Sequence, residues 1–269
     1  MADGHAWELI RRLPHPALRS AVLEYQGYRE RVQGTLRRRE LPSAGITVII
    51  NLGPPLVVDG RRLAESFVAG LCTSHSLVDT IGEMEGVEVR LTPTGARRLF
   101  GIPMSDLANR VVPLDDILSL AGRAAIARIR EAATWQERFA LLERELASRL
   151  DRAPGTPAVL AHAWRQLAAT DGRVSIRALA KEAAWSPKRL VATFRDQAGL
   201  PPKQVARLFR FQRAVGELAR PDARLTAVAY SAGYYDQAHL IREVREFAGV
   251  TPTELVRQIH PDLPGLIDG

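Results

Sequence analysis

The chain has 269 residues, of which 46% are hydrophobic and 25% charged, and its formal net charge is +7 at pH 7. The length favours two domains of ordinary globular composition, and the short apolar runs exclude a transmembrane helix. The first residues lack the basic-then-apolar pattern of a secretion signal. With Cys72 as the single cysteine, no internal disulfide can form, which fits a reducing cytoplasm.

The positive charge is unevenly distributed along the chain. Residues 156–269 hold 16 Lys and Arg against 11 Asp and Glu, whereas residues 1–155 hold 21 against 19. An excess in one region is what a polyanion-binding domain requires. Arg outnumbers Lys 34 to 3, however, so compositional bias contributes to this charge and charge alone does not establish DNA binding.

The first part of the chain is predicted to be a lead-in followed by strands. Residues 1–34 contain a possible strand near Trp7 and a short helix or strand start from His15 to Tyr25. The basic run Arg37–Arg39 is interpreted as a solvated strand edge or loop, in preference to a second nucleic-acid contact. Runs rich in β-branched residues predict four strands, at residues 46–52, 56–58, 67–71 and 87–91. The last run alternates, so we expect one of its faces to be solvated.

Helical patterns follow from residue 94. A short helix is predicted over residues 94–100, and residues 115–131 and 134–150 are predicted to form a helical hairpin. Its second helix carries an apolar stripe of Trp135, Phe139, Leu142, Leu146 and Leu150. This stripe could pack on the chain's own sheet or join two subunits. The fold class is therefore an α+β domain over residues 1–152, containing a small β-sheet, helices and the helical hairpin 115–150.

A linker over residues 151–157, marked by two prolines and a glycine, separates this domain from an all-α domain over residues 156–260. The second domain is predicted to begin with a helix over residues 158–169. The inward positions of this helix are Leu160, Trp164 and Leu167.

A helix–turn–helix pattern then occurs twice, over about residues 175–199 and 225–249. Two copies are too few for a solenoid, so we interpret them as a pair of matching modules. The equivalent positions, offset by 49 and then 50 residues, are Leu179 with Val228, Trp185 with Tyr234, Ser186 with Asp236, Leu190 with Leu240, and Gly199 with Gly249.

Local signals place the second helix of each copy. Ser186 and Asp236 are suitable N-caps because their side-chain oxygens can accept from first-turn amides. Pro187 fits the first helical position, and Gly199 and Gly249 fit the left-handed position that ends a helix.

A helical wheel divides each second helix into an inner and an outer face. Leu190 and Phe194 point inward in the first copy, and Leu240 and Val244 do so in the second. Basic and small residues on the outer faces suit a major groove, where Arg and Lys can reach guanine and Gln can reach adenine. The outer and flanking positions are Lys188, Arg189, Ala192, Arg195, Gln237, Ala238, His239, Ile241, Arg242 and Arg245.

A longer helix over residues 202–219 connects the two copies. Leu208, Phe211 and Val215 are predicted to face the core. Arg207, Arg210 and Arg213 are predicted to face solvent or phosphate. At ~1.5 Å per residue this helix spans roughly 25 Å.

One known family combines these features. The positions that carry the comparison are Leu179, Ala180, Ser186, Leu190, Phe194, Gly199, Pro202, Ala229, Gly233, Tyr234, Leu240 and residues 249–252. Residues 175–256 resemble the DNA-binding domain of the AraC/XylS family of transcription regulators. The resemblance implies two helix–turn–helix units that read successive major grooves on one face of DNA. It implies base-facing positions at Lys188, Val191, Ala192, Gln237, Ala238, Ile241 and Arg242.

Three positions depart from the family pattern. Val191 and Ala192 are apolar where members often carry polar residues, and Val244 replaces the usual aromatic residue. We therefore expect the first unit to read bases mainly through Lys188. Ser186, as the N-cap at the start of the same helix, completes the expected DNA-binding set.

The sequence thus predicts a sequence-specific DNA-binding transcription regulator, with DNA as its partner. The resemblance implies an effector-sensing or oligomerising first domain, and hence a small-molecule effector and a homodimer through helices 115–150. No cofactor and no metal are expected, because the histidines are far apart and lack a nearby carboxylate set. No catalytic residue is expected either. Two alternatives stay open, namely a DNA-targeted enzyme such as a thiol-dependent repair activity at Cys72, and an oligomer that organises DNA non-specifically.

Overall fold

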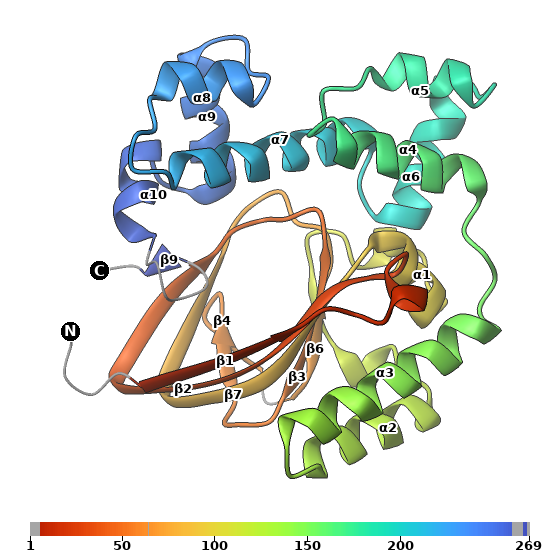
Figure 1. The fold of residues 1–269 in the computed structure, drawn as a ribbon, viewed down its shortest axis with the longest axis vertical. Helices are drawn as coiled ribbons and strands as arrows, with labels where there is room; N and C mark the ends of the chain where they lie inside the picture. Colours follow the sequence, from red (N-terminus) through yellow and green to blue (C-terminus); the bar gives the residue numbers. More distant parts are fainter. Residues whose placement is uncertain (1–5, 64, 260–265, 268–269) are drawn as a thin grey trace.

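The structure is a computed structural model that describes residues 6–63 and 65–259 and the backbone of residues 266–267. A curled antiparallel sheet builds the N-terminal half, and helices build the C-terminal half above it (Figure 1). The strands are β1 (Ala6–Arg12), β2 (Val22–Glu40), β3 (Ile46–Asn51), β4 (Leu56–Val58), β5 (Arg61–Leu63), β6 (Phe67–Ala69), β7 (Ser76–Leu91), β8 (Val111–Pro113) and β9 (Leu266–Ile267).

The sheet is organised around its two long strands. Its main order is β1-β2-β7-β3-β6-β8, with β4 joined to β5 and β7, and β9 joined to β2. The β2–β7 ladder shifts register between Arg31 and Thr35. Gly34 and Gly82 lie at this shift with φ of 85° and 71°, a conformation that glycine adopts without strain. The shift lets β7 pair with β3 through one half and with β4 through the other, so the sheet curls around an interior space.

Three helices cover one side of the sheet, namely α1 (Pro93–Phe100), α2 (Leu120–Glu131) and α3 (Trp135–Arg152). The predicted apolar stripe of α3 faces the sheet, and Phe139 packs on Tyr25 with ring centroids 5.6 Å apart. Phe139, Leu142, Leu146 and Leu150 are buried in the single chain. Of the two alternatives for this stripe, packing within the chain is therefore the one observed.

The C-terminal half contains α4 (Ala158–Ala169), α5 (Ile176–Glu182), α6 (Pro187–Ala198), α7 (Pro202–Leu218), α8 (Leu225–Ser231), α9 (Gln237–Ala248) and α10 (Pro252–Gln258). Figure 1 shows one helix pair at each end of α7, which runs along the open side of the curled sheet. Leu160, Leu167, Leu208 and Phe211 are fully buried, as predicted. One apolar core runs continuously through both halves of the chain.

The predicted α+β domain followed by an all-α domain is confirmed. Several element predictions were wrong, however. Residues 22–40 form one long strand that the sequence did not predict, and residues 76–86 extend the predicted strand 87–91. Their polar residues pair through backbone ladders, which no hydrophobic pattern reveals. The first hairpin helix begins at Leu120, where Ser119 caps it, because residues 114–116 form a 3₁₀ turn.

The predicted domain division lies between α3, which ends at Arg152, and α4, which begins at Ala158. Residues 1–5 and 260, at the ends of the two predicted domains, lie outside the described residues. In the part of the chain that the structure describes, none of the helices combines the length and the apolar character that crossing a bilayer requires.

Candidate nucleic-acid interface and interdomain cavity

The two repeated units have matching turns. In the first, the Trp185 amide donates to the Ala180 carbonyl at 2.9 Å; in the second, the Tyr234 amide donates to the Ala229 carbonyl at 2.8 Å. The residue before each aromatic is left-handed, with φ of 51° at Ala184 and 79° at Gly233. The repeated sequence pattern thus corresponds to a repeated backbone geometry.

The second helix of each unit, α6 or α9, is anchored by its inner face. Leu190, Phe194, Leu240 and Val244 have no exposed surface. The caps also form as predicted. Ser186 Oγ accepts from the Arg189 amide at 3.2 Å, and Asp236 Oδ1 accepts from the His239 amide at 2.6 Å.

The predicted DNA-contacting residues lie on the outer surfaces of α6 and α9. Three are partly exposed, namely Val191, Gln237 and Ile241. The remaining positions are exposed, and these are Ser186, Lys188, Arg189, Ala192, Arg195, Ala238, Arg242 and Arg245. The N-terminal half therefore leaves both faces open, and their contacts with bases stay a prediction.

The charges on these faces are largely uncommitted. Lys188, Arg195 and Arg242 form no ion pair with any described residue. Arg189 instead lies over the Trp185 ring, 4.5 Å from its centroid, which fixes the start of α6 against the preceding turn. Unpaired exposed cations are free to neutralise phosphates or to contact bases without first breaking an internal bond.

The prediction that Arg207 and Arg210 are exposed was wrong. Arg207 forms ion pairs with Glu243 at 2.7 Å and Glu246 at 2.5 Å, and its guanidinium lies over Phe247. Arg210 is half-buried and lies over the Tyr234 ring. Both arginines attach α7 to the second unit, because helical periodicity does not reveal which neighbouring helix covers a face.

Comparison with known proteins agrees with this geometry. Residues 179–258 match the helix-turn-helix domain family, which spans both units and α10. The match covers nearly all of the part of the chain that resembles the DNA-binding domain of the AraC/XylS family. The chain contains a helix-turn-helix domain and is a DNA-binding transcription regulator. Its residues 10–113 match a domain of unknown function, DUF6597.

Solved structures give further comparisons for the regulator. It aligns with apo ToxT from Vibrio cholerae at 9% identity and a TM-score of 0.47, covering 93% of this chain and 100% of ToxT. An AraC-type regulator domain from Chromobacterium violaceum aligns at 21% identity and a TM-score of 0.36, over 40% of this chain and 95% of that one. The C-terminal domain of AraT from Geobacillus stearothermophilus aligns at 16% identity and 0.36, over 40% and 92%. No curated protein matches the regulator.

The N-terminal half contacts the C-terminal ends of both α6 and α9. Arg97 of α1 lies 3.8 Å from the carboxylate of Asp196 on α6. Arg39 of β2 donates to the Ala248 carbonyl at the end of α9, at 3.1 Å. The run Arg37–Arg39 is therefore part of a strand, and the prediction of a solvated edge or loop was wrong for Arg38, which is buried against Glu30.

A cavity of about 670 Å³ lies between the curled sheet and α7. The sheet contributes residues of β1 to β4 and of β6 to β8. Helix α7 contributes Phe211, Gln212, Val215 and Gly216, and Ala219 follows at its C-terminal cap. The amide of Ala44, on the loop after β2, donates to Gln212 Oε1 at 3.1 Å, which ties α7 to the sheet beside this cavity.

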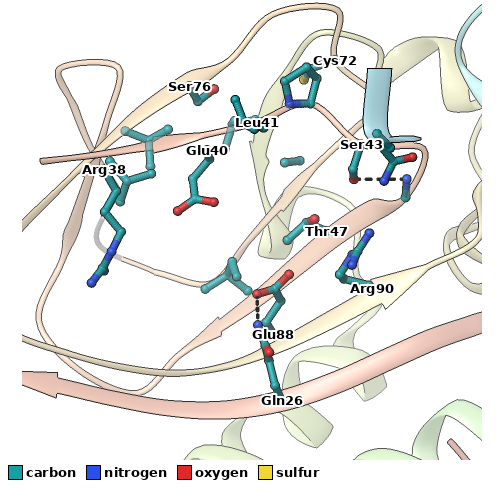
Figure 2. Close-up of a pocket in the computed structure, with 18 of the residues that line it drawn as sticks. Gln26, Arg38, Glu40, Leu41, Ser43, Thr47, Cys72, Ser76, Glu88 and Arg90 are labelled. Atoms are coloured by element: carbon teal, nitrogen blue, oxygen red, sulfur yellow. Dashed lines mark hydrogen bonds between the residues drawn. The ribbon is translucent and has the colours of Figure 1, made fainter. Parts of the chain in front are cut away.

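The polar lining of the cavity includes three acidic residues, Glu24, Glu40 and Glu88, and Figure 2 shows the side chains of Glu40 and Glu88. Burial, together with the nearby charge of Glu88, raises the pKa of Glu40 to about 7. Burial also raises the pKa of Glu88, although its hydrogen bond from Gln26 opposes this shift. Glu40 is exposed by its accessible surface because it borders the cavity. Its pKa is nevertheless raised, because the protein atoms that line the cavity displace much of the water around the carboxylate.

Sequence reasoning favoured a pocket lined by sheet residues in the first domain but did not identify its residues or the contribution of α7. The alternation in residues 87–91 was interpreted as one core face and one solvated face. Val87, Val89 and Leu91 are indeed buried, but Glu88 and Arg90 on the opposite face line the cavity. The signal in the sequence was the alternation of charged residues, Glu88 and Arg90, with apolar residues. This alternation indicated a polar face on the strand but did not indicate that the face lines a cavity.

Cys72 also borders the cavity. Its thiol donates to the Gly70 carbonyl at 3.3 Å, and burial raises its pKa. A raised pKa reduces the thiolate fraction, which disfavours the nucleophilic chemistry that a thiol-dependent repair activity would need.

Proposed function

We propose that this regulator responds to a small molecule that binds in the cavity between the sheet and α7. The observation that carries this proposal is that α7 both lines the cavity and joins the two helix–turn–helix units. A volume of about 670 Å³ lies within the range of roughly 300–1,000 Å³ that is typical of small-molecule sites.

The mechanism follows from the contacts at the two ends of α7. Arg97 holds α6 and Arg39 holds α9 on the same N-terminal half. A ligand that favours one position of α7 over another would change the relative placement of α6 and α9, and hence their fit to two successive grooves. Such a ligand acts through its different affinity for the two arrangements.

The cavity can be blocked to test this proposal. Gly216 lies on α7 at the cavity, and a Cβ added there meets no atom within 4 Å. Gly216→Trp should fill the space beneath α7, change DNA affinity without ligand and remove the response to ligand. Gly216→Ala, a matched control at the same position, should leave both unchanged. An unaltered affinity and response in Gly216→Trp would contradict the proposal.

We further propose that Lys188 and Arg242 read bases, together with the smaller outer-face residues of α6 and α9. Replacing either with Ala should cost about 1–3 kcal/mol on the preferred site. Arg128, an exposed arginine of α2 in the N-terminal half, provides a control that should have no effect. The preferred site would come from in-cell mapping of bound DNA. Equal losses on preferred and random duplex would contradict base reading.

The remaining expectations are proposals of the same kind. A homodimer through residues 115–150 would have to use the outer face of the hairpin, because the apolar stripe of α3 is buried within the chain. We place the domain division between residues 152 and 156, and the regulator in the cytoplasm. Analytical ultracentrifugation with and without DNA would test the dimer.

A further inference from the structure

We infer that the cavity binds a protonated amine with an apolar body, whose ammonium group lies between the carboxylates of Glu40 and Glu88. This inference rests on one part of the proposed function, namely that the cavity is the effector site. It adds the chemical class of the ligand.

The two carboxylates come from different strands. Glu40 ends β2, and Glu88 lies on β7. Figure 2 shows both carboxylates pointing into the space, with Glu88 held by Gln26 at 2.7 Å. Glu40 forms no hydrogen bond and no ion pair with the described residues. An acceptor that points into a cavity without a partner is suited to a donor supplied by a ligand.

The cations that border the cavity are already committed to other acceptors. Arg38 turns away from Glu40 in Figure 2 and pairs with the buried Glu30. Arg90 pairs with Glu24 at 2.7 Å. The third, Arg11, is exposed and donates to Gln26 Oε1 at 3.4 Å. Arg38 and Arg90 thus have carboxylate partners, whereas Arg11 has only the neutral Gln26 amide and acts on Glu88. Glu40 has no such cation partner among the described residues, so an ammonium group would complete a charge pair with it.

Electrostatics around Glu40 support the same assignment. The charged groups that face it are Glu30 and Arg38 on β2 and Glu88 on β7, and burial is the largest cause of its raised pKa. The phenol of Tyr28 is close as well, because Glu40 contributes to the raised pKa of that tyrosine. A site in which carboxylate charge is disfavoured gains most from a bound cation.

Apolar residues of the cavity lining fit the apolar body. A separate apolar cluster, distinct from the main core, consists of Ile49, Leu56, Val58 and Phe67, with Val78 and Met84 packed against it. All six residues line the cavity. A ligand with one charged end and a hydrocarbon or aromatic body would place each part against a matching wall, as ligand sites of this size commonly do.

Three probes of equal chain length test the charge requirement. Isothermal titration calorimetry on the full chain would compare n-octylammonium, octanol and octanoate. We expect octylammonium to bind about tenfold or more tightly than octanol, which is the fold-change of a charge-assisted hydrogen bond, and octanoate to bind most weakly. Equal affinity for amine and alcohol, preference for octanoate, or failure of octylammonium to bind would overturn the inference.

Two variants assign the effect to the cavity. Glu40→Gln keeps the side-chain shape and should lose about tenfold or more of the octylammonium affinity. Glu83→Gln changes an exposed glutamate that pairs with Arg31 on the outer surface and should have no effect. Circular dichroism would establish that both variants are folded. An amine affinity unchanged in folded Glu40→Gln would overturn the inference.

Proton release gives a second measurement. An ammonium beside Glu40 favours its ionised form, so binding near pH 7 should release about half a proton, because the pKa of this group is about 7. Titrations in buffers of different ionisation enthalpy would measure this release, and Glu40→Gln should abolish it. Failure of the proposed function is distinguishable, because octylammonium would then bind without changing DNA affinity. If octanol or octanoate changed DNA affinity through the cavity while the amine did not, only the charge inference would fail.

Discussion

Arg207 on α7 offers a sharp test of how the second helix–turn–helix unit is held. Its guanidinium donates to Glu243, whose side chain is 3% exposed, and to Glu246, which is 54% exposed. Breaking a buried pair from one side costs about 3–5 kcal/mol, because the remaining charge is left without a partner. The exposed pair contributes about 0–1 kcal/mol. We therefore expect Arg207→Ala to destabilise the chain by about 3–5 kcal/mol.

Urea unfolding followed by circular dichroism would measure this loss. Glu246→Gln should cost less than about 1 kcal/mol. Arg207→Ala combined with Glu243→Gln should cost less than Arg207→Ala alone, because the unpaired carboxylate is gone. The slope of log affinity for DNA against log salt should not change. A stable Arg207→Ala protein whose salt slope falls by about 1 would show that Arg207 contacts phosphate and would refute the reasoning.

Three other changes have definite expected outcomes. Gly233→Ala should destabilise the second unit by about 1–2 kcal/mol, because φ is 79° and the new Cβ would lie 2.9 Å from Arg173. Ala184 lies at the equivalent turn of the first unit, with φ of 51°. Ala184→Gly should therefore be neutral or stabilise the chain by up to about 1 kcal/mol. If the melting temperatures of both variants fell, or both rose, this expected difference would be contradicted. Gly216→Ala should raise the free energy of unfolding by about 0.5–1 kcal/mol, since it removes a glycine from a helix without a clash, and an unchanged or lower melting temperature would argue against it. The pKa of Glu40 rises on folding from 4.5 to about 7, so the native state binds more protons between these pH values. The free energy of unfolding should therefore fall as pH rises from about 4.5 to about 7. Glu40→Gln should reduce this pH dependence, and an identical pH profile for the variant would refute the prediction.

Local signals were reliable where short-range physics decides the structure. The two helix–turn–helix units were predictable because each contains its own cap, apolar stripe and terminating glycine within about 25 residues. Ser186 and Asp236 form the expected caps. Leu190 and Leu240 are buried as their periodicity required. These features depend on contacts between residues near in sequence, so the sequence alone was sufficient to identify them.

Contacts between segments that are not adjacent in sequence could not be predicted in this way. The backbone ladder between β2 and β7 joins residues whose side chains carry no strong strand signal, so both strands were underestimated. Arg38 and Arg207 were predicted to be exposed because charge on a strand edge or helix face usually is. Glu243 covers Arg207 from another helix. Glu30 covers Arg38 from the same strand, on the other side of the register shift between Arg31 and Thr35.

The amino-acid sequence by itself determined that this protein carries paired DNA-binding units behind a β-rich domain, because repeats, caps and periodic apolar residues act over a few turns of chain. Only the tertiary structure decided that α7 and the sheet enclose a cavity. Only there do Glu40 and Glu88 come together, because they belong to different strands of a curled sheet. Side chains that are separated by half a domain in sequence acquire a shared environment, and thus a shifted pKa, only when the chain closes around them.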